Sequence, residues 1–185
     1  MFLPWTSLFP GAMLPLHIFE ERYRVMCKLA LSSNRMIAIA HATDKGKIAD
    51  IGSLGVIRAA VTNADGTSNL ILQGIGRVAF GAIKMEPFPQ AILSVLPESE
   101  EDDASLTSLR TKISDACLAT FADNTEALQY LKKHISETSS DSDFTDMISS
   151  ILIDPQSRCA LLEELNIENR MHLLLDALQS DNLDV

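Results

Sequence analysis

Residues 8–23 read LFPGAMLPLHIFEERY, and this stretch decides the fold of the first half of the chain. Its Pro-Gly pair is a turn signal between two apolar segments. We therefore expect strands over about residues 2–8 and 12–18. Apolar side chains then recur at intervals of three and four, which predicts a helix over residues 19–32.

Short strand-like segments follow the helix. The Asp65-Gly66 pair is a strong hairpin signal between two of them. Glycines at 74 and 76 interrupt a third, and glycines inside strands indicate bulges or bends of a small, curled barrel. The predicted strands cover about residues 36–42, 51–61, 70–73, 78–85 and 90–96.

Charge and glycine content both change near residue 97. Residues 1–97 carry nine Lys or Arg and six Asp or Glu, whereas residues 98–185 carry six and nineteen. All eight glycines lie before residue 82. A change in charge and glycine content at an acidic segment is typical of a structural boundary. We predict two subdomains, 1–97 and 98–185.

The second half has helical periodicity throughout. Apolar stripes predict helices over about residues 104–121, 128–135 and 143–153, with a polar loop over 136–142. Asp154-Pro155 then predicts an N-cap followed by the first residue of a short helix. Asn166 is expected to cap the last helix. Strands followed by helices indicate an α+β protein, with a small β-barrel and one early helix before a helical bundle.

Composition excludes several classes of protein. The three cysteines are far apart and form no CxxC pair, so a disulfide framework is not expected. The first 19 residues contain three prolines and no Lys or Arg, unlike a signal peptide. No stretch approaches the ~20 apolar residues that span a bilayer. We expect a cytoplasmic protein that has no membrane partner.

Motifs of the common catalytic and cofactor sites are missing from the sequence. There is no G-x-x-x-x-G-K-[ST] phosphate loop and no G-x-S-x-G serine turn. His134 and Glu137 are three residues apart near a predicted helix end, which is weak evidence for a metal ligand pair. We therefore predict no catalytic residue, no cofactor and no metal.

Three blocks of the sequence resemble the N-terminal domain of Lon proteases. Residues 51–57, the Asp65-Gly66 turn and residues 70–77 are similar to its G-T-x-A-x-I, D-G and L-V-x-G-x-x-R segments. Residues 158–163 resemble its K-Q-x-L-L-E segment more weakly, since Arg158 and Cys159 replace Lys-Gln. Asn169-Arg170 is similar to its E-R-L segment. The first block matches the pattern P-L-x-I-F-E-x-R-Y at Pro15, Leu16, Ile18, Phe19, Glu20, Arg22 and Tyr23.

The resemblance implies a fold and a function. The fold is a barrel of the pseudouridine-synthase-and-archaeosine-transglycosylase (PUA) type, followed by a helical bundle. The function is that of a stand-alone, non-catalytic recognition module without the ATPase and peptidase of full-length Lon. Such a module binds exposed or unfolded protein segments and makes oligomer contacts, as an adaptor or regulator of proteolysis.

The motif residues are candidates for ligand contact, although we expect them chiefly to build the fold. Phe19 and Tyr23 are expected in the core, and Arg77 near carbonyl groups at the barrel bend. Glu20 or Glu21 is expected to pair with Arg24 or Lys28 on the surface. The candidate positions are Pro15, Phe19, Glu20, Arg22, Tyr23, Gly74 and Arg77.

Two other functions stay open at this point. Barrels of this type also occur in RNA-modifying enzymes, so an RNA-binding PUA-like module is the alternative. The net charge of −10 disfavours nucleic acid as a partner, because phosphates would be repelled. A small hydrolase is the third possibility, and no motif in the sequence supports it.

Overall fold

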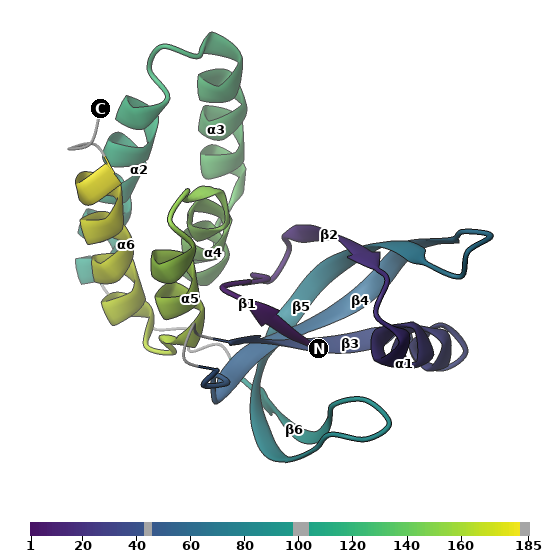
Figure 1. The fold of residues 1–185 in the computed structure, drawn as a ribbon. Helices are drawn as coiled ribbons and strands as arrows, with labels where there is room; N and C mark the ends of the chain where they lie inside the picture. The colour runs from purple at the N-terminus through teal and green to yellow at the C-terminus, as the bar shows by residue number, and fades with distance from the viewer. Residues whose placement is uncertain (43–45, 98–103, 182–185) are drawn as a thin grey trace. The chain divides into compact units, whose positions relative to one another are not determined.

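The computed structural model describes residues 1–42, 46–97 and 104–181 (Figure 1). The chain divides into two compact units, Met1–Pro97 and Glu98–Val185. In the described ranges, the first unit contains strands β1–β6 and helix α1, and the second contains helices α2–α6. This arrangement confirms the predicted α+β class.

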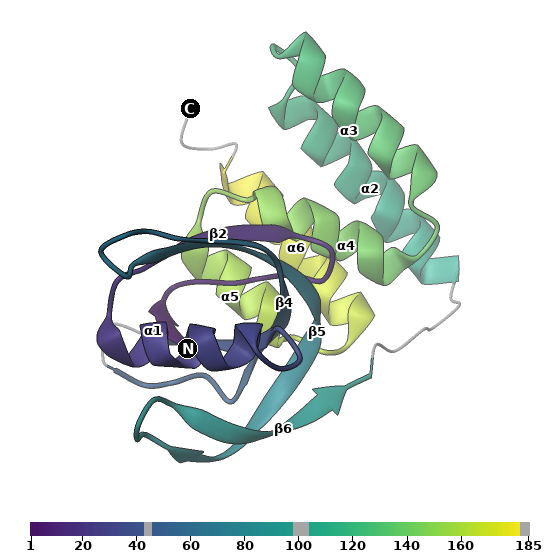
Figure 2. The same cartoon turned by 90° about the vertical axis from the view of Figure 1, so that its right-hand side faces the viewer.

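A mixed sheet forms most of the first unit. Its strands pair in the order β1-β3-β4-β5-β2, and β6 also pairs with β5. Strands β4 and β5 are strongly bent, which gives the sheet a curled form (Figure 2). The elements are β1 (Phe2–Pro4), β2 (Met13–Ile18), α1 (Glu21–Leu31), β3 (Met36–Ala42), β4 (Ile51–Thr62), β5 (Ser68–Lys84) and β6 (Gln90–Leu96).

Strand β5 organises the sheet. It is one strand of 17 residues, so the prediction of two shorter strands at 70–73 and 78–85 was wrong. Strand β4 lies along one edge of it, and β2 followed by β6 lies along the other. The register between β4 and β5 shifts between Leu54 and Gly55 of β4, which lie opposite Gly76 and Gly74 of β5. The glycines therefore bend the strand without ending it, because a bulge absorbs the extra residue.

Gly74 lies where a second backbone crosses β5 closely. The Gly11 amide donates to the Gly74 carbonyl at 2.9 Å, and the Gly74 amide donates to the Ala12 carbonyl at 3.0 Å. A Cβ on residue 74 would lie 2.1 Å from the carbonyl oxygen of Phe9. Only glycine fits this crossing without displacing the backbone.

The first predicted strand, residues 2–8, is shorter than expected. Strand β1 ends at Pro4, and Trp5 has a φ of 45°, in the left-handed region. A residue there turns the chain out of an extended path. Beyond the turn, the Leu8 amide donates to the Ser53 hydroxyl at 3.3 Å, in place of a ladder bond.

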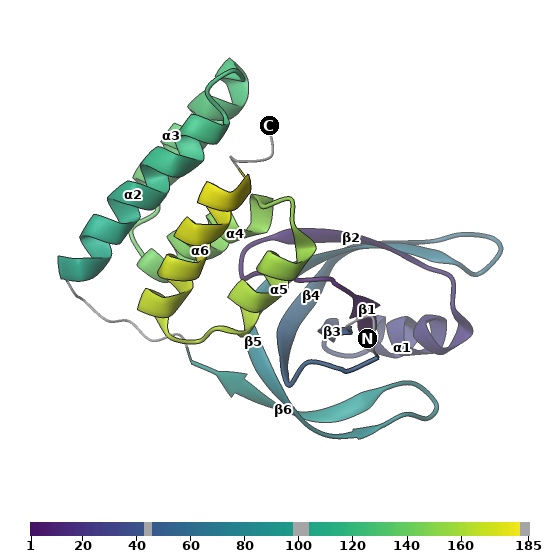
Figure 3. The same ribbon diagram turned by 60° about the vertical axis from the view of Figure 1, so that its left-hand side comes forward.

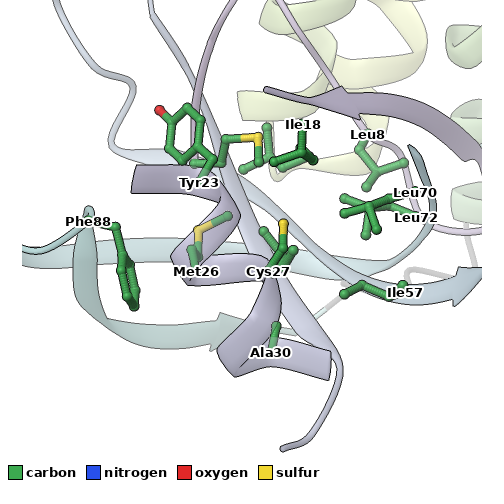
Figure 4. Packing of buried hydrophobic residues seen from close by; sticks show 13 residues of the cluster. Leu8, Ile18, Tyr23, Met26, Cys27, Ala30, Ile57, Leu70, Leu72 and Phe88 are labelled. Carbon is green, nitrogen blue, oxygen red and sulfur yellow. The ribbon is translucent and has the colours of Figure 1, made fainter. Parts of the chain in front are cut away.

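The core of the first unit lies between α1 and the sheet (Figure 4). Tyr23 is buried, as predicted, and its hydroxyl bonds to both the amide and the carbonyl of Phe2, at 3.1 and 3.2 Å. Phe19 was predicted to be buried and is 65% exposed, so that prediction was wrong. The physical reason is that α1 begins only at Glu21, so Phe19 continues the outward row of β2.

The second unit is a bundle in which α6 contacts α2, α4 and α5, and α2 also contacts α3 and α4 (Figure 3). The predicted caps are confirmed: Asp154 accepts from the Ser157 amide at 2.7 Å, and Asn166 from the Asn169 amide at 2.9 Å. The helices are α2 (Ala104–Thr120), α3 (Thr125–Glu137), α4 (Asp141–Ile151), α5 (Pro155–Glu163) and α6 (Ile167–Asp181).

Helix α4 starts and ends two residues earlier than predicted. The Ser140 side chain caps it by accepting from the Asp143 amide at 3.2 Å. The guanidinium of Arg110 on α2 contacts both sides of the connection between α3 and α4. It donates to the Asp141 carboxylate at 2.8 Å and to the Ile135 carbonyl at 3.3 Å. It also lies 4.2 Å from the ring centroid of Phe144. These contacts tie three helices together at one point.

A buried ion pair lies inside the bundle. Arg170 of α6 and Asp146 of α4 are each 1% exposed, and their nearest charged atoms are 3.7 Å apart. The Arg170 guanidinium also donates to the Ser142 hydroxyl at 2.8 Å. Charged side chains are almost never buried unless they are paired. The pair therefore links α4 to α6 in one specific arrangement.

No helix in the described part of the chain has both the length and the apolar character needed to cross a membrane.

Candidate functional site

The outward face of strands β2, β5 and β4 carries exposed apolar side chains. Successive side chains of a strand point to opposite faces of the sheet, so the register sorts them. Pro15 of β2, Ile71 of β5 and Ala59 of β4 are neighbours in one cross-strand row. The adjacent row, centred on Leu70, packs into the core. The first row therefore faces away from the core.

Most of these outward residues adjoin one another in the cross-strand register, and Phe19 is joined to them through the ring of His17; we call the set the sheet-face patch. Met13 is 57% exposed, Val61 63% and Ile71 43%. Single exposed apolar side chains are common, whereas a contiguous group marks an interaction surface. The sheet-face patch consists of Met13, Pro15, Phe19, Ala59, Val61 and Ile71.

Polar side chains within and beside the patch are paired with one another. A ring nitrogen of His17 lies 2.8 Å from the Asn69 side-chain oxygen, and the His17 ring stacks on Phe19 at 6.2 Å between centroids. Arg58 donates to the Gln73 side-chain oxygen at 2.7 Å. The patch itself carries no formal charge. It is therefore suited to an apolar partner and offers no fixed charge for an ionic one.

The patch is slightly hollowed. The depression follows strands β2, β5 and β4 and has a volume of about 490 Å³. Pro15, Ala59, Val61 and Ile71 of the patch line it, together with His17 and Asn69. An open depression of this shape receives side chains of a partner surface, in contrast to the enclosed pockets that hold small ligands.

Two of the seven residues predicted from the sequence, Pro15 and Phe19, lie in the sheet-face patch. Glu20, Arg22 and Tyr23 lie instead at the start of α1. Arg22 pairs with Glu20 at 2.8 Å, and its guanidinium lies 4.6 Å from the Tyr23 ring centroid. These contacts brace the first turn of the helix.

The remaining two candidates lie inside the fold. Gly74 is buried at the backbone crossing, and Arg77 is 1% exposed with its guanidinium 6.0 Å from the Phe9 ring centroid. The seven residues therefore do not converge on one site. Of the predicted surface pairs, Arg24 with Glu21 is confirmed at 3.1 Å.

The three cysteines are buried and are poor nucleophiles. Burial raises the pKa of the Cys27, Cys117 and Cys159 thiols to about 11, so thiolates are scarce at neutral pH. Among the described residues, no three His, Cys, Asp or Glu side chains are grouped so that they could hold a metal ion.

Sequence reasoning missed Met13, Ala59, Val61 and Ile71 of the sheet-face patch. The signal was present in β2, whose sequence MLPLHI is apolar at nearly every position instead of alternating with polar residues. A strand with one solvated face normally alternates. Apolar residues on both faces of a strand therefore indicate that its outward face also contacts a partner, and the strand register shows which residues of the neighbouring strands share that face.

Comparison with known proteins identifies the family of the chain. The family model described as the ATP-dependent protease La (LON) substrate-binding domain matches residues 1–180. The chain belongs to this family. The Lon substrate-binding domain is a non-catalytic domain, and membership in its family supports a substrate-recognition module.

Solved structures of Lon N-terminal domains share the fold. The N-terminal domain of Mycobacterium avium complex Lon protease has a TM-score of 0.78 at 18% identity, covering 97% of this chain and 96% of that one. The Lon N-terminal domain protein from Xanthomonas campestris has a TM-score of 0.70 at 20% identity, covering 95% of each chain.

A curated relative is similar in sequence to part of the chain. The Lon protease of Desulfosudis oleivorans is 28% identical over 119 residues, which are 58% of this chain. The match covers 14% of the length of that protease.

Proposed function

We propose that the chain binds exposed or unfolded protein segments through the sheet-face patch, as an adaptor or regulator of proteolysis. The observation that carries the proposal is the contiguous, uncharged apolar surface on β2, β5 and β4. Membership in the Lon substrate-binding family supports it, because recognition of a protein substrate requires a surface of this kind.

The exposed fractions indicate a weak, reversible interaction. Fully burying a large aliphatic side chain contributes about 1.5–3 kcal/mol. Met13, Phe19, Val61 and Ile71 are 43–65% exposed, so each has about half of that still to gain. Four such contributions give a gross gain of roughly 3–6 kcal/mol, and the entropy of association offsets part of it, so these four side chains alone support an affinity of about millimolar or weaker. Such an affinity suits a module that samples many segments.

The chemistry of the patch selects unfolded over native protein. Native proteins bury most of their large apolar side chains, whereas an unfolded chain presents them on an extended backbone. The absence of charge in the patch residues means that no particular charged sequence is required. Selection therefore depends on apolar exposure, which is the property that distinguishes a damaged protein from an intact one.

A direct binding comparison tests the proposal. A permanently unfolded probe, reduced and carboxymethylated α-lactalbumin carrying a fluorophore, is titrated with the chain and followed by anisotropy. Native α-lactalbumin with the same fluorophore is the matched control. We expect saturable binding of the unfolded probe and at least tenfold weaker binding of the native one. Equal binding of the two probes, or binding of neither, contradicts the proposal.

A further inference from the structure

Among the described residues, strand β6 is an edge strand with one unpaired side. It pairs with β5 from Arg77↔Leu96 to Lys84↔Gln90. Within the part of the chain that the structure describes, it pairs with no other strand. In an antiparallel pair, every second residue directs its amide and carbonyl away from the partner. About half of the seven β6 residues therefore present hydrogen-bonding groups to the free side.

Strand β6 itself contains no charge and no proline, although Pro89 precedes it, Pro97 follows it and its register with β5 shifts between Phe80 and Ile83. Natural proteins place charges, prolines or bulges along exposed edge strands to prevent pairing with other chains. Residues 87–97 contain no charged side chain, although the chain as a whole has a net charge of −10. Ile92 is 78% exposed and Val95 is 70% exposed. The edge thus combines open backbone groups with apolar side chains.

An apolar cavity adjoins the same strand. Leu93 of β6 lines it together with Phe80 and Ile83 of β5 and with Phe88 in the connection between them. Met36 of β3 also lines it. The cavity has a volume of about 280 Å³, enough for one or two apolar side chains. A strand added beside β6 would direct alternate side chains toward this side of the sheet.

We propose that the free edge of β6 binds an extended, uncharged apolar segment of a substrate protein as an additional strand. Backbone hydrogen bonds to the edge would supply affinity that is independent of sequence, and the cavity beside Leu93 would select an apolar side chain. The inference rests on the proposed function and adds to it the backbone conformation of the bound segment and the strand that receives it.

Charge and area favour a substrate segment over a second copy of this chain. The edge is neutral, so an apolar segment approaches it without an ionic requirement. Seven residues span roughly 23 Å at ~3.3 Å per residue. A strip one strand wide and of that length buries far less than the ~1,200 Å² of a standard stable interface. Such a contact is suited to transient capture.

A peptide with a blocked backbone tests the inference. The probe is a fluorescein-labelled ten-residue peptide of alternating valine and serine, capped at both ends. Its matched control has the same side chains and is N-methylated at two adjacent central residues, which removes one amide donor from each edge. The protein variants are Ile92→Lys with Val95→Lys, and the control variant is Ile153→Lys, whose side chain is 88% exposed outside the strands.

We expect the N-methylated peptide, and the double β6 variant with the plain peptide, to bind at least tenfold more weakly than the unmodified pair. Ile153→Lys should bind as the wild type does. Circular dichroism checks that the double variant is folded, and the N-methylated peptide tests the idea on the wild-type protein in any case.

The remaining outcomes distinguish failure of this inference from failure of the proposed function. Binding of unfolded α-lactalbumin that is unaffected by the β6 variant overturns this inference and leaves the proposed function standing. Failure of the wild type to bind either the peptide or the unfolded protein overturns both. A wild-type dimer in sedimentation velocity that the β6 variant dissociates assigns the edge to a second copy and also overturns the inference.

Discussion

Removing the carboxylate of Asp146 should destabilise the helical unit strongly. Asp146→Ala leaves the Arg170 guanidinium, 1% exposed, without the facing charge 3.7 Å away. The Ser142 hydroxyl at 2.8 Å is among the partners that stay, and it carries no charge. Breaking a buried ion pair by removing one member costs about 3–5 kcal/mol, because the other charge is left uncompensated. We expect a loss of that size in the free energy of unfolding.

Replacing both members should restore most of that loss. In Asp146→Leu with Arg170→Met, both charges are exchanged for apolar groups of similar size, and such exchanges range from neutral to stabilising by about 1–4 kcal/mol. The difference between the double variant and the sum of the single variants is the coupling energy. Asp143→Ala is the matched control, because this exposed carboxylate lies on the same helix and should cost less than about 1 kcal/mol.

Guanidinium denaturation followed by two signals measures these differences. Circular dichroism at 222 nm reports mainly on the helices, whereas Trp5 is the sole tryptophan and its fluorescence reports on the first unit. A coincident shift of both signals would mean that the two units unfold together. A cost below 1 kcal/mol for Asp146→Ala, or single-variant costs that simply add, would refute the argument from the buried pair.

Three further predictions follow from local geometry. Gly74→Ala should lower the free energy of unfolding by about 1–3 kcal/mol, since its Cβ would meet the Phe9 carbonyl at 2.1 Å, and an unchanged denaturation midpoint would show that the crossing relaxes freely. Asp154→Ala should cost ~1 kcal/mol at pH 7 as a lost N-cap. Hydrogen bonds from Ser157 and Gln156 lower the pKa of Asp154, so its contribution is present above the unfolded pKa of about 3.9 and is lost as the pH falls through the lower folded value. A wild-type advantage that persists in full at pH 2 argues against this reading. The three cysteines should react with a thiol reagent only on unfolding, because burial raises their pKa to about 11, and fast labelling of the native protein would contradict their burial.

Much of the fold could be predicted from local signals. The hairpin at Asp65-Gly66, the Asp154 and Asn166 caps and the α+β order depend on turn and capping chemistry that neighbouring residues determine. The misjudged features depend on contacts between distant segments. Strand β5 continues through Gly74 because residues 10–12 cross it there, and Phe19 is exposed because α1 starts late.

The candidate surface was harder to predict for the same reason. Met13, Val61 and Ile71 belong to three strands, and only the register of β2, β5 and β4 brings them together. Motif matching selected residues that the fold requires, such as the buried Arg77 and Gly74. Pro15 and Phe19 were selected by a different block, P-L-x-I-F-E-x-R-Y, and do reach the surface. A motif therefore located one strand of the patch and gave no indication of the other two.

The affinity of an unfolded protein for a sheet-face variant tests the central claim most directly. Val61→Thr with Ile71→Thr keeps the β-branched shape of both side chains and replaces apolar surface by hydroxyl groups. Ile153→Thr, at an 88% exposed apolar residue outside the sheet, is the matched control. We predict that the dissociation constant of carboxymethylated α-lactalbumin rises about tenfold for the double variant, or about 1.4 kcal/mol. It should be unchanged for Ile153→Thr. Equal dissociation constants for the wild type and the folded double variant would contradict the assignment of recognition to this face of the sheet.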